Sequence, residues 1–162
     1  LGLIGDADVV EPLFKAVGHP DPTIRKQALS SLTRIRHVDN FSPVIPALSD
    51  ENSAVRKAAI TAMATLKGPD SVPDIRFLLD DEDVWVRYHT INTIGAFGQT
   101  EFADVILPYL EDDNDVIKIA AVKALAQMRY RDALPQLQQL RRNRNEDVVE
   151  AVNLAVGDLE AD

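Results

Sequence analysis

The sequence predicts an all-α protein, an α-solenoid of about five stacked 31-residue helix–turn–helix repeats. Two observations lead to this fold class. Four segments that begin with Arg or Lys recur every 31 residues, which is the interval from Arg25 to Arg56. Each contains a regular set of apolar residues, and a second apolar set recurs at the same spacing upstream of each segment. The apolar positions fall on one stripe of a helix with 3.6 residues per turn. A single helix pair cannot bury such a stripe alone, so neighbouring repeats must stack.

The second helix of each repeat, here called helix B, is predicted from segments that begin with Arg or Lys. These segments are RKQALSSLTRI (25–35), RKAAITAMATL (56–66), RYHTINTIGAF (87–97) and KIAAVKALAQM (118–128). Buried positions recur at equal offsets, as in Leu29, Ile60, Ile91 and Val122. Small residues flank this stripe, and they allow neighbouring B helices to approach closely. We therefore expect a right-angled stack of helix pairs.

A shorter helix A precedes each helix B, and it is marked by Leu13, Val44, Ile75, Ile106 and Leu137. Asp21, Asn52, Asp83 and Asn114 stand just before helix B, where a side-chain oxygen can accept from an unpaired backbone N–H. In the fifth repeat, roughly 132–162, the register of the 31-residue pattern shifts by about one residue around Arg141–Asn145. We expect this repeat to be frayed or terminal.

Residues 1–162 are predicted to form a single solenoid. The first residues, LGLIGDADVV, suggest the end of one helix followed by a turn, which favours a piece of a longer protein. The composition, 46% hydrophobic and 27% charged, is typical of a soluble globular protein. No apolar run approaches the ~18 residues that a membrane span requires. We expect a soluble cytoplasmic protein without membrane insertion.

Motifs of the common enzyme classes are missing from the sequence. There is no cysteine, P-loop, GxSxG or GxGxxG pattern, and no histidine has a second ligand at metal-binding spacing. The acidic runs Asp80–Asp83 and Glu111–Asp115 lack the glycine and terminal Glu of a calcium-binding EF-hand loop. Structural roles as helix caps and dipole partners account for these acids. We expect no metal, no cofactor and no catalytic activity.

Two segments, GDADVVEPLFKAVGHPDPTIRKQALSSL and LLDDEDVWVRYHTINTIGAFG, resemble HEAT repeats, in particular the short HEAT-like repeats of the phycobilisome-lyase type. The resemblance covers nearly the whole chain. It implies that the B helices line a concave surface. It also implies a ladder between repeats, in which an acid of the A–B turn pairs with a basic residue six positions later: Asp50 with Arg56, Asp81 with Arg87, and Asp112 with Lys118. The first repeat departs from this pattern because His19 stands opposite Arg25.

Helical geometry turns a second stripe of helix B outward. Its members are Lys26, Gln27, Ser30, Arg34, Lys57, Ala58, Thr61, Thr65, Trp85, Tyr88, His89, Asn92, Ile119, Ala120, Lys123 and Gln127. This stripe carries cations and no acid, although the net charge of the protein is −9. Its centre is aromatic and apolar, a composition typical of a binding hot spot. Alternatively, Trp85 covers the wall of the solenoid by packing over the adjacent helix.

These observations favour a non-catalytic scaffold that binds a protein or peptide segment, with an apolar anchor and some negative charge, on the concave face of the B helices. The predicted contact residues are Trp85, Tyr88, His89, Asn92 and Ile119 at the centre, with Lys26, Lys57 and Lys123 as rim charges. The resemblance implies an alternative, a bilin lyase subunit or tetrapyrrole chaperone. In that case Trp85, Tyr88 and His89 would line a pigment pocket. A third alternative, nucleic-acid binding as in HEAT-like DNA glycosylases, is disfavoured by the acidic charge and the few cations.

Overall fold

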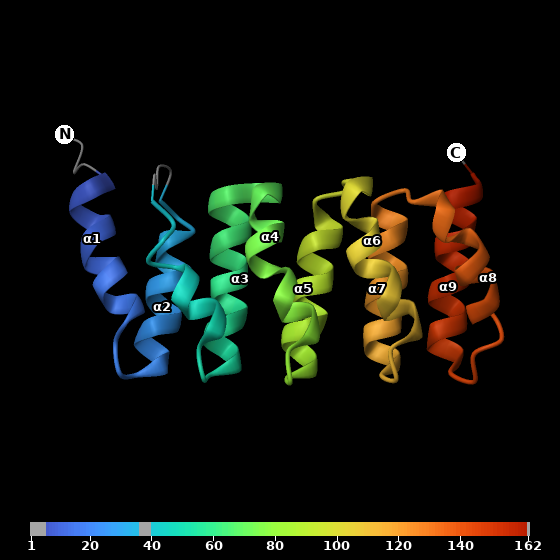
Figure 1. The fold of residues 1–162 in the computed structure, drawn as a ribbon, viewed down its shortest axis with the longest axis horizontal. Coiled ribbons are helices and arrows are strands. Elements are labelled where there is room, and N and C mark those ends of the chain that lie inside the picture. The colour runs from blue at the N-terminus through green and yellow to red at the C-terminus, as the bar shows by residue number, and fades with distance from the viewer. Residues whose placement is uncertain (1–5, 36–39, 162) are drawn as a thin grey trace. The chain divides into compact units, whose positions relative to one another are not determined.

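A computed structural model describes residues 6–35 and 40–161, and every regular element in these ranges is helical (Figure 1). The sequence predicts a helix end and a turn for residues 1–10; residues 1–5 lie outside the described residues, as does His37, and residues 6–10 belong to helix α1 (Asp6–Val17). The chain divides into two compact units, Leu1–Leu78 and Leu79–Asp162, here called the N-terminal and C-terminal units. The all-helical repeat architecture confirms the predicted α-solenoid.

In the N-terminal unit, α1 (Asp6–Val17) packs against α2 (Pro22–Leu32), and α2 packs against α3 (Ser53–Lys67). The 3₁₀ helix η1 (Ile45–Ser49) packs on α3. The segments η2 (Gly68–Ser71), α4 (Val72–Ile75) and the first residues of η3 (Arg76–Asp80) follow α3. The largest fully buried side chains of this unit are Leu29, Leu32, Leu48, Ile60, Met63, Ile75 and Leu78. They come from the predicted apolar stripes, so packing of the stripes builds the core.

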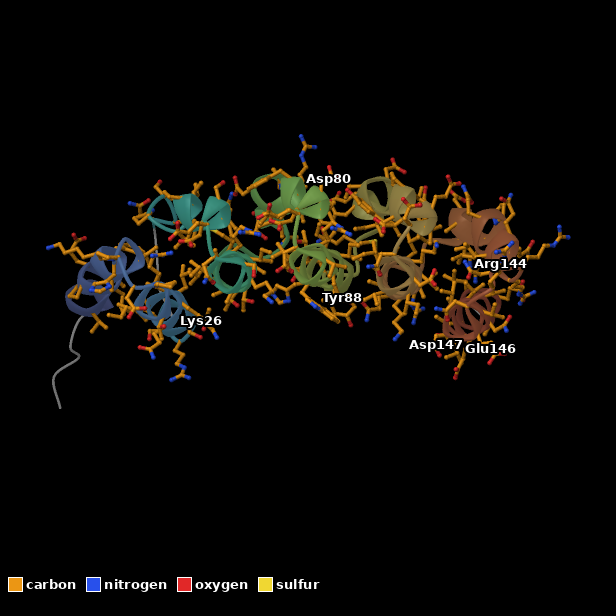
Figure 2. All side chains as sticks on the ribbon, turned by 90° about the horizontal axis from the view of Figure 1, so that it is seen from below. Lys26, Asp80, Tyr88, Arg144, Glu146 and Asp147 are labelled. Atoms are coloured by element: carbon orange, nitrogen blue, oxygen red, sulfur yellow. The ribbon has the colours of Figure 1, made fainter. Side chains whose placement is uncertain are left out.

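In the C-terminal unit, α7 (Asp115–Gln127) packs against both α5 (Val84–Ala96) and α9 (Glu146–Glu160), and these three B helices form one layer. The other layer contains the A elements of the unit (Figure 2). They are η4 (Thr100–Phe102), α6 (Ala103–Ile106), η5 (Leu107–Glu111), η6 (Arg131–Ala133) and α8 (Leu134–Leu140). Ile91, Ile94, Ile106 and Ile117 are fully buried in this unit.

The N-caps show that the 31-residue register is kept through the last repeat. The side chains of Asp21, Asn52, Asp83 and Asn114 accept from the N–H two residues later, at 2.7 to 2.9 Å. Asn145, one repeat after Asn114, accepts from Asp147 N at 2.9 Å in the same way. Helix α9 then runs for 15 residues and buries Val148, Val152 and Val156. The expectation of a shifted, frayed fifth repeat is wrong.

The A elements of the second, third and fourth repeats are divided into short segments rather than forming one helix each. Helices α4 and α6 have four residues each and are flanked by 3₁₀ turns. Proline occupies the first turn of η1, η2, α4 and η5. Because proline has no N–H, it interrupts the i→i−4 hydrogen bonds of a preceding helix and is tolerated where a new segment starts.

The ladder between repeats begins in the first repeat. Arg25 Nε and Nη2 each donate to a carboxylate oxygen of Asp50 at 2.7 Å, and both side chains are 10% exposed. Arg25 Nη1 donates to the carbonyl oxygens of His19 and Pro20. Burial by itself raises the pKa of Asp50, but the hydrogen bonds from Arg25 and from the Asn52 amide outweigh it. The pKa of Asp50 is therefore below its usual value.

At the six-residue spacing of the expected ladder, an arginine side chain donates to the backbone carbonyl oxygen of the acidic residue. Arg56 Nη1 donates to the carbonyl oxygen of Asp50 at 2.8 Å, and Arg87 Nη1 donates to that of Asp81 at 2.9 Å. Lys118 pairs with Asp115 at 3.0 Å rather than with the predicted Asp112, so that expectation is wrong. The ion pair between Arg25 and the Asp50 carboxylate joins residues 25 positions apart in the sequence. This separation is six residues shorter than the 31-residue repeat. The acid therefore meets the basic residue of the preceding repeat.

Candidate functional site

An aromatic pair, the exposed Trp85 and the half-buried Tyr88, lies at the start of α5. The rings of Trp85 and Tyr88 meet edge to face, with centroids 5.8 Å apart and planes at 76°. Trp85 is 54% exposed. The Asp83 cap accepts from Trp85 N at 2.8 Å and thus fixes the first turn of α5. Tyr88 lies on the side of α5 away from Asp80 (Figure 2), so the pair belongs to the outer face of the B layer.

The remaining predicted contact residues of the C-terminal unit lie on α5 and α7. His89, Asn92 and Ile119 are half-buried, and Lys123 is exposed. Asn92 Nδ2 donates to the Tyr88 carbonyl at 2.8 Å, so this amide stabilises its own helix.

Ala120, which the helical pattern turns outward, is fully buried. The reason is that α7 packs against α5 on one side and against α9 on the other. These two contacts leave a smaller part of the α7 surface open to solvent than the helical pattern alone predicts.

A hollow of about 310 Å³ lies between α7 and α9 on this layer. It is lined by Lys123, Ala126, Gln127, Ala151, Leu154, Ala155 and Asp158. Leu154 is 63% exposed, and the alanines leave the space that larger side chains would fill. The sequence prediction does not include Leu154, because it expects the fifth repeat to be frayed. The signal was present, since Leu154 stands one repeat after Lys123 and two repeats after Asn92.

The outer face of α9 is acidic. Asp147, Glu150 and Asp158 are exposed, and they stand one repeat beyond Val116, Ile119 and Gln127. The expected stripe without acids therefore does not continue into α9, where Asp158 lines the same hollow as Lys123. The predicted rim residues Lys26, which is exposed, and Lys57, which is half-buried, lie on α2 and α3 of the N-terminal unit.

The acids of the run Asp80–Asp83 have structural partners. Asp80 accepts from the Tyr109 hydroxyl at 2.7 Å, and Asp81 accepts from Asp83 N at 2.8 Å. Burial and the Asp80 carboxylate raise the pKa of Tyr109. Within residues 6–35 and 40–161, no group of three or more His, Asp or Glu is placed to hold a metal ion. None of the helices in these ranges has the length and apolar character to cross a membrane.

Comparison with solved structures shows the same fold. The complex of CpcE and CpcF of phycocyanin lyase from Nostoc sp. PCC7120 contains a chain that is 20% identical, with a TM-score of 0.76. The alignment covers 94% of this chain and 65% of that one, so this chain spans about two thirds of its length. A designed armadillo repeat protein is 20% identical with a TM-score of 0.62, over 95% of this chain and 83% of the other.

An engineered protein is 19% identical with a TM-score of 0.60, over 96% of this chain and 81% of the other. A comparison with curated proteins finds no match. The family model of HEAT repeats matches residues 20–85, 41–115 and 75–157, and these ranges together cover most of the sequence. The chain therefore belongs to the HEAT-repeat family.

Proposed function

We propose that this protein is a non-catalytic interaction scaffold whose C-terminal unit binds a partner protein segment on the outer face of α5, α7 and α9. The observation that supports this function best is the Trp85–Tyr88 pair, in which the exposed Trp85 packs edge to face on the half-buried Tyr88. Tyr and Trp supply large, rigid contact area, and they are enriched among the residues that dominate binding energy at interfaces.

Apolar side chains continue from the aromatic pair across the layer. Val116 is 36% exposed on α7, and Leu154 is 63% exposed beside the hollow on α9. Packed helices lie about 8–10 Å apart, so a segment crossing the three helices meets an apolar contact at each. The hollow accepts one aliphatic side chain of that segment. Lys123 favours a carboxylate near the middle, whereas the acids of α9 favour a basic residue at the end.

Affinity capture with mass spectrometry tests this function. The double variant Trp85→Ala with Tyr88→Ala should lower partner capture by at least ~10-fold, because hot-spot truncation costs about 2 kcal/mol or more. Phe77→Ala is the matched control, since Phe77 is 51% exposed in η3 and outside the B layer. It should leave capture unchanged, and circular dichroism should show full helix content in both variants. If the double variant captures the same partner as well as the native protein, this surface is not the interface.

A bilin-handling role is the second candidate, and the similarity to a chain of the CpcE–CpcF complex of phycocyanin lyase favours it. In this role the chain acts with a partner subunit, and Trp85, Tyr88 and His89 contact the pigment. Trp85 is the only tryptophan of the chain, so its fluorescence reports on this face alone. A bilin bound there should quench Trp85 and shift the pigment's absorbance. Neither change would appear if the pigment does not bind.

A further inference from the structure

The turn before α9 reverses the charge of its sister turn. It reads Arg142-Asn143-Arg144-Asn145, whereas the turn before α7, one repeat earlier, reads Glu111-Asp112-Asp113-Asn114. The last residue caps the following helix in both turns. Because Asn114 performs this function beside acids, the cap does not require the arginines. Their presence in a protein of net charge −9 calls for another explanation.

These cations line a hollow of about 580 Å³. Its lining consists of Asp115, Lys118, Arg142, Asn143, Arg144 and Asn145. Lys118 Nζ donates to Asp115 at 3.0 Å, and Asn145 Nδ2 donates to the other oxygen of Asp115 at 2.9 Å. This network ties the turn to the start of α7 and holds Lys118 in place, with its side chain 15% exposed. The hollow therefore contains three cationic side chains and one carboxylate, that of Asp115. Both oxygens of this carboxylate already accept hydrogen bonds, one from Lys118 and one from Asn145.

The two arginines lack a counter-charge. Arg142 and Arg144 are exposed, and neither guanidinium forms an ion pair or hydrogen bond with a residue in the described part of the chain. The nearest acids in sequence are Glu146 and Asp147. Arg144 lies toward α8, whereas Glu146 and Asp147 lie on the other side of α9 (Figure 2). Asn143 also replaces the acid that the sister turn has at this position, and it therefore removes a repulsion toward an anion.

We propose that this turn is a binding site for a phosphate monoester. Guanidinium groups donate two parallel hydrogen bonds to phosphate oxygens, and a lysine ammonium adds a compact positive charge. The phosphate is carried either by a small metabolite or by a phosphorylated residue of a partner protein. The site is separate from the aromatic face of α5, so it does not depend on the proposed partner segment.

Isothermal titration and amide NMR of the whole chain at low ionic strength test the site with two probes, inorganic phosphate and a phosphoserine peptide. The native protein should bind at least one of them saturably, with shifts at the amides of residues 142–147. The variant Arg142→Gln with Arg144→Gln should weaken binding by at least ~10-fold, since two charge-assisted hydrogen-bonding groups are lost. Added salt should weaken binding in the native protein.

The control variant is Arg76→Gln with Arg131→Gln, which removes the same charge from exposed positions outside the hollow. It should bind like the native protein. A further variant, Arg142→Glu with Asn143→Asp and Arg144→Asp, copies the acidic character of the sister turn, so it should fold and lose binding. Binding of inorganic phosphate indicates a small-anion ligand, and binding of the phosphopeptide alone indicates a phosphorylated partner. The site is disproved if neither probe binds saturably, or if the arginine and control variants lose equal affinity.

Discussion

The guanidinium of Arg25 and the carboxylate of Asp50 form two parallel hydrogen bonds of 2.7 Å, and this pair joins α2 to the turn before α3. Both side chains are 10% exposed. Glu51 also approaches Arg25, at 3.6 Å, but its side chain is 85% exposed. Arg25 therefore has one acidic partner shielded from solvent, Asp50, and one exposed to it, Glu51.

Asp50→Ala should lower the free energy of unfolding by about 1–3 kcal/mol, because it leaves the Arg25 guanidinium without its hydrogen-bonded partner. Glu51→Ala should cost less than about 0.5 kcal/mol, since exposed ion pairs contribute little. Urea unfolding followed by circular dichroism measures both. Equal losses of unfolding free energy in the two variants would show that shielding from solvent does not strengthen the Arg25–Asp50 pair.

Stability should fall as the pH drops below the ordinary aspartate pKa of 3.8. The pKa of Asp50 is lowered in the fold, so the unfolded chain binds more protons than the folded one in this range. The stabilisation is complete above the unfolded-state pKa and is lost as the pH falls through the folded-state pKa. Asp50→Asn should reduce this acid dependence in urea-unfolding curves recorded between neutral pH and acid. An unchanged dependence would contradict the assignment to Asp50.

Gly95→Ala should destabilise the C-terminal unit. A Cβ at Gly95 would stand 2.7 Å from Ala124 Cβ and 2.9 Å from Ala124 Cα, so α5 and α7 would have to separate. The cost of such overpacking, about 1–3 kcal/mol, exceeds or cancels the ~1 kcal/mol that alanine gains in helix propensity.

Gly157→Ala is the matched control, because nothing lies within 4 Å of the added Cβ in α9. It should raise stability by about 0.5–1 kcal/mol. Thermal unfolding of both variants measures the difference. A stabilising Gly95→Ala would show that α5 and α7 are not in close contact there.

Leu154→Ala should weaken the partner captured through Trp85 and Tyr88 by roughly tenfold, if the segment extends from α5 to the hollow on α9. Fold stability should change little, since Leu154 is 63% exposed. Ile45→Ala provides the control, because Ile45 is 45% exposed in η1 of the N-terminal unit. Binding affinities of purified partner and variants give the answer. Full affinity of Leu154→Ala would confine the interface to α5 and α7.

The repeat length determined most of the fold in advance. Cap residues at 31-residue intervals predicted where each helix B begins, because an N-cap needs only its own side chain and the next backbone amides. The same interval predicted the outward positions of Trp85, Tyr88 and Lys123, since these depend on the geometry of one helix. The expected shift in register around Arg141–Asn145 left the outward positions of the fifth helix B unpredicted, and Leu154 is one of them.

Only the tertiary structure decided which residues of different repeats meet. The partner of Arg25 is Asp50 because α2 packs beside the next repeat, and no property of either residue alone specifies that contact. Ala120 is buried because α7 has a neighbour on each flank, although its place on the helix faces outward. The sequence by itself determined helices, caps and repeat spacing, which are local. Packing between repeats determined the Arg25–Asp50 pair, the hollow at Leu154 and the hollow beside Arg142 and Arg144, because each is formed by side chains from two neighbouring repeats.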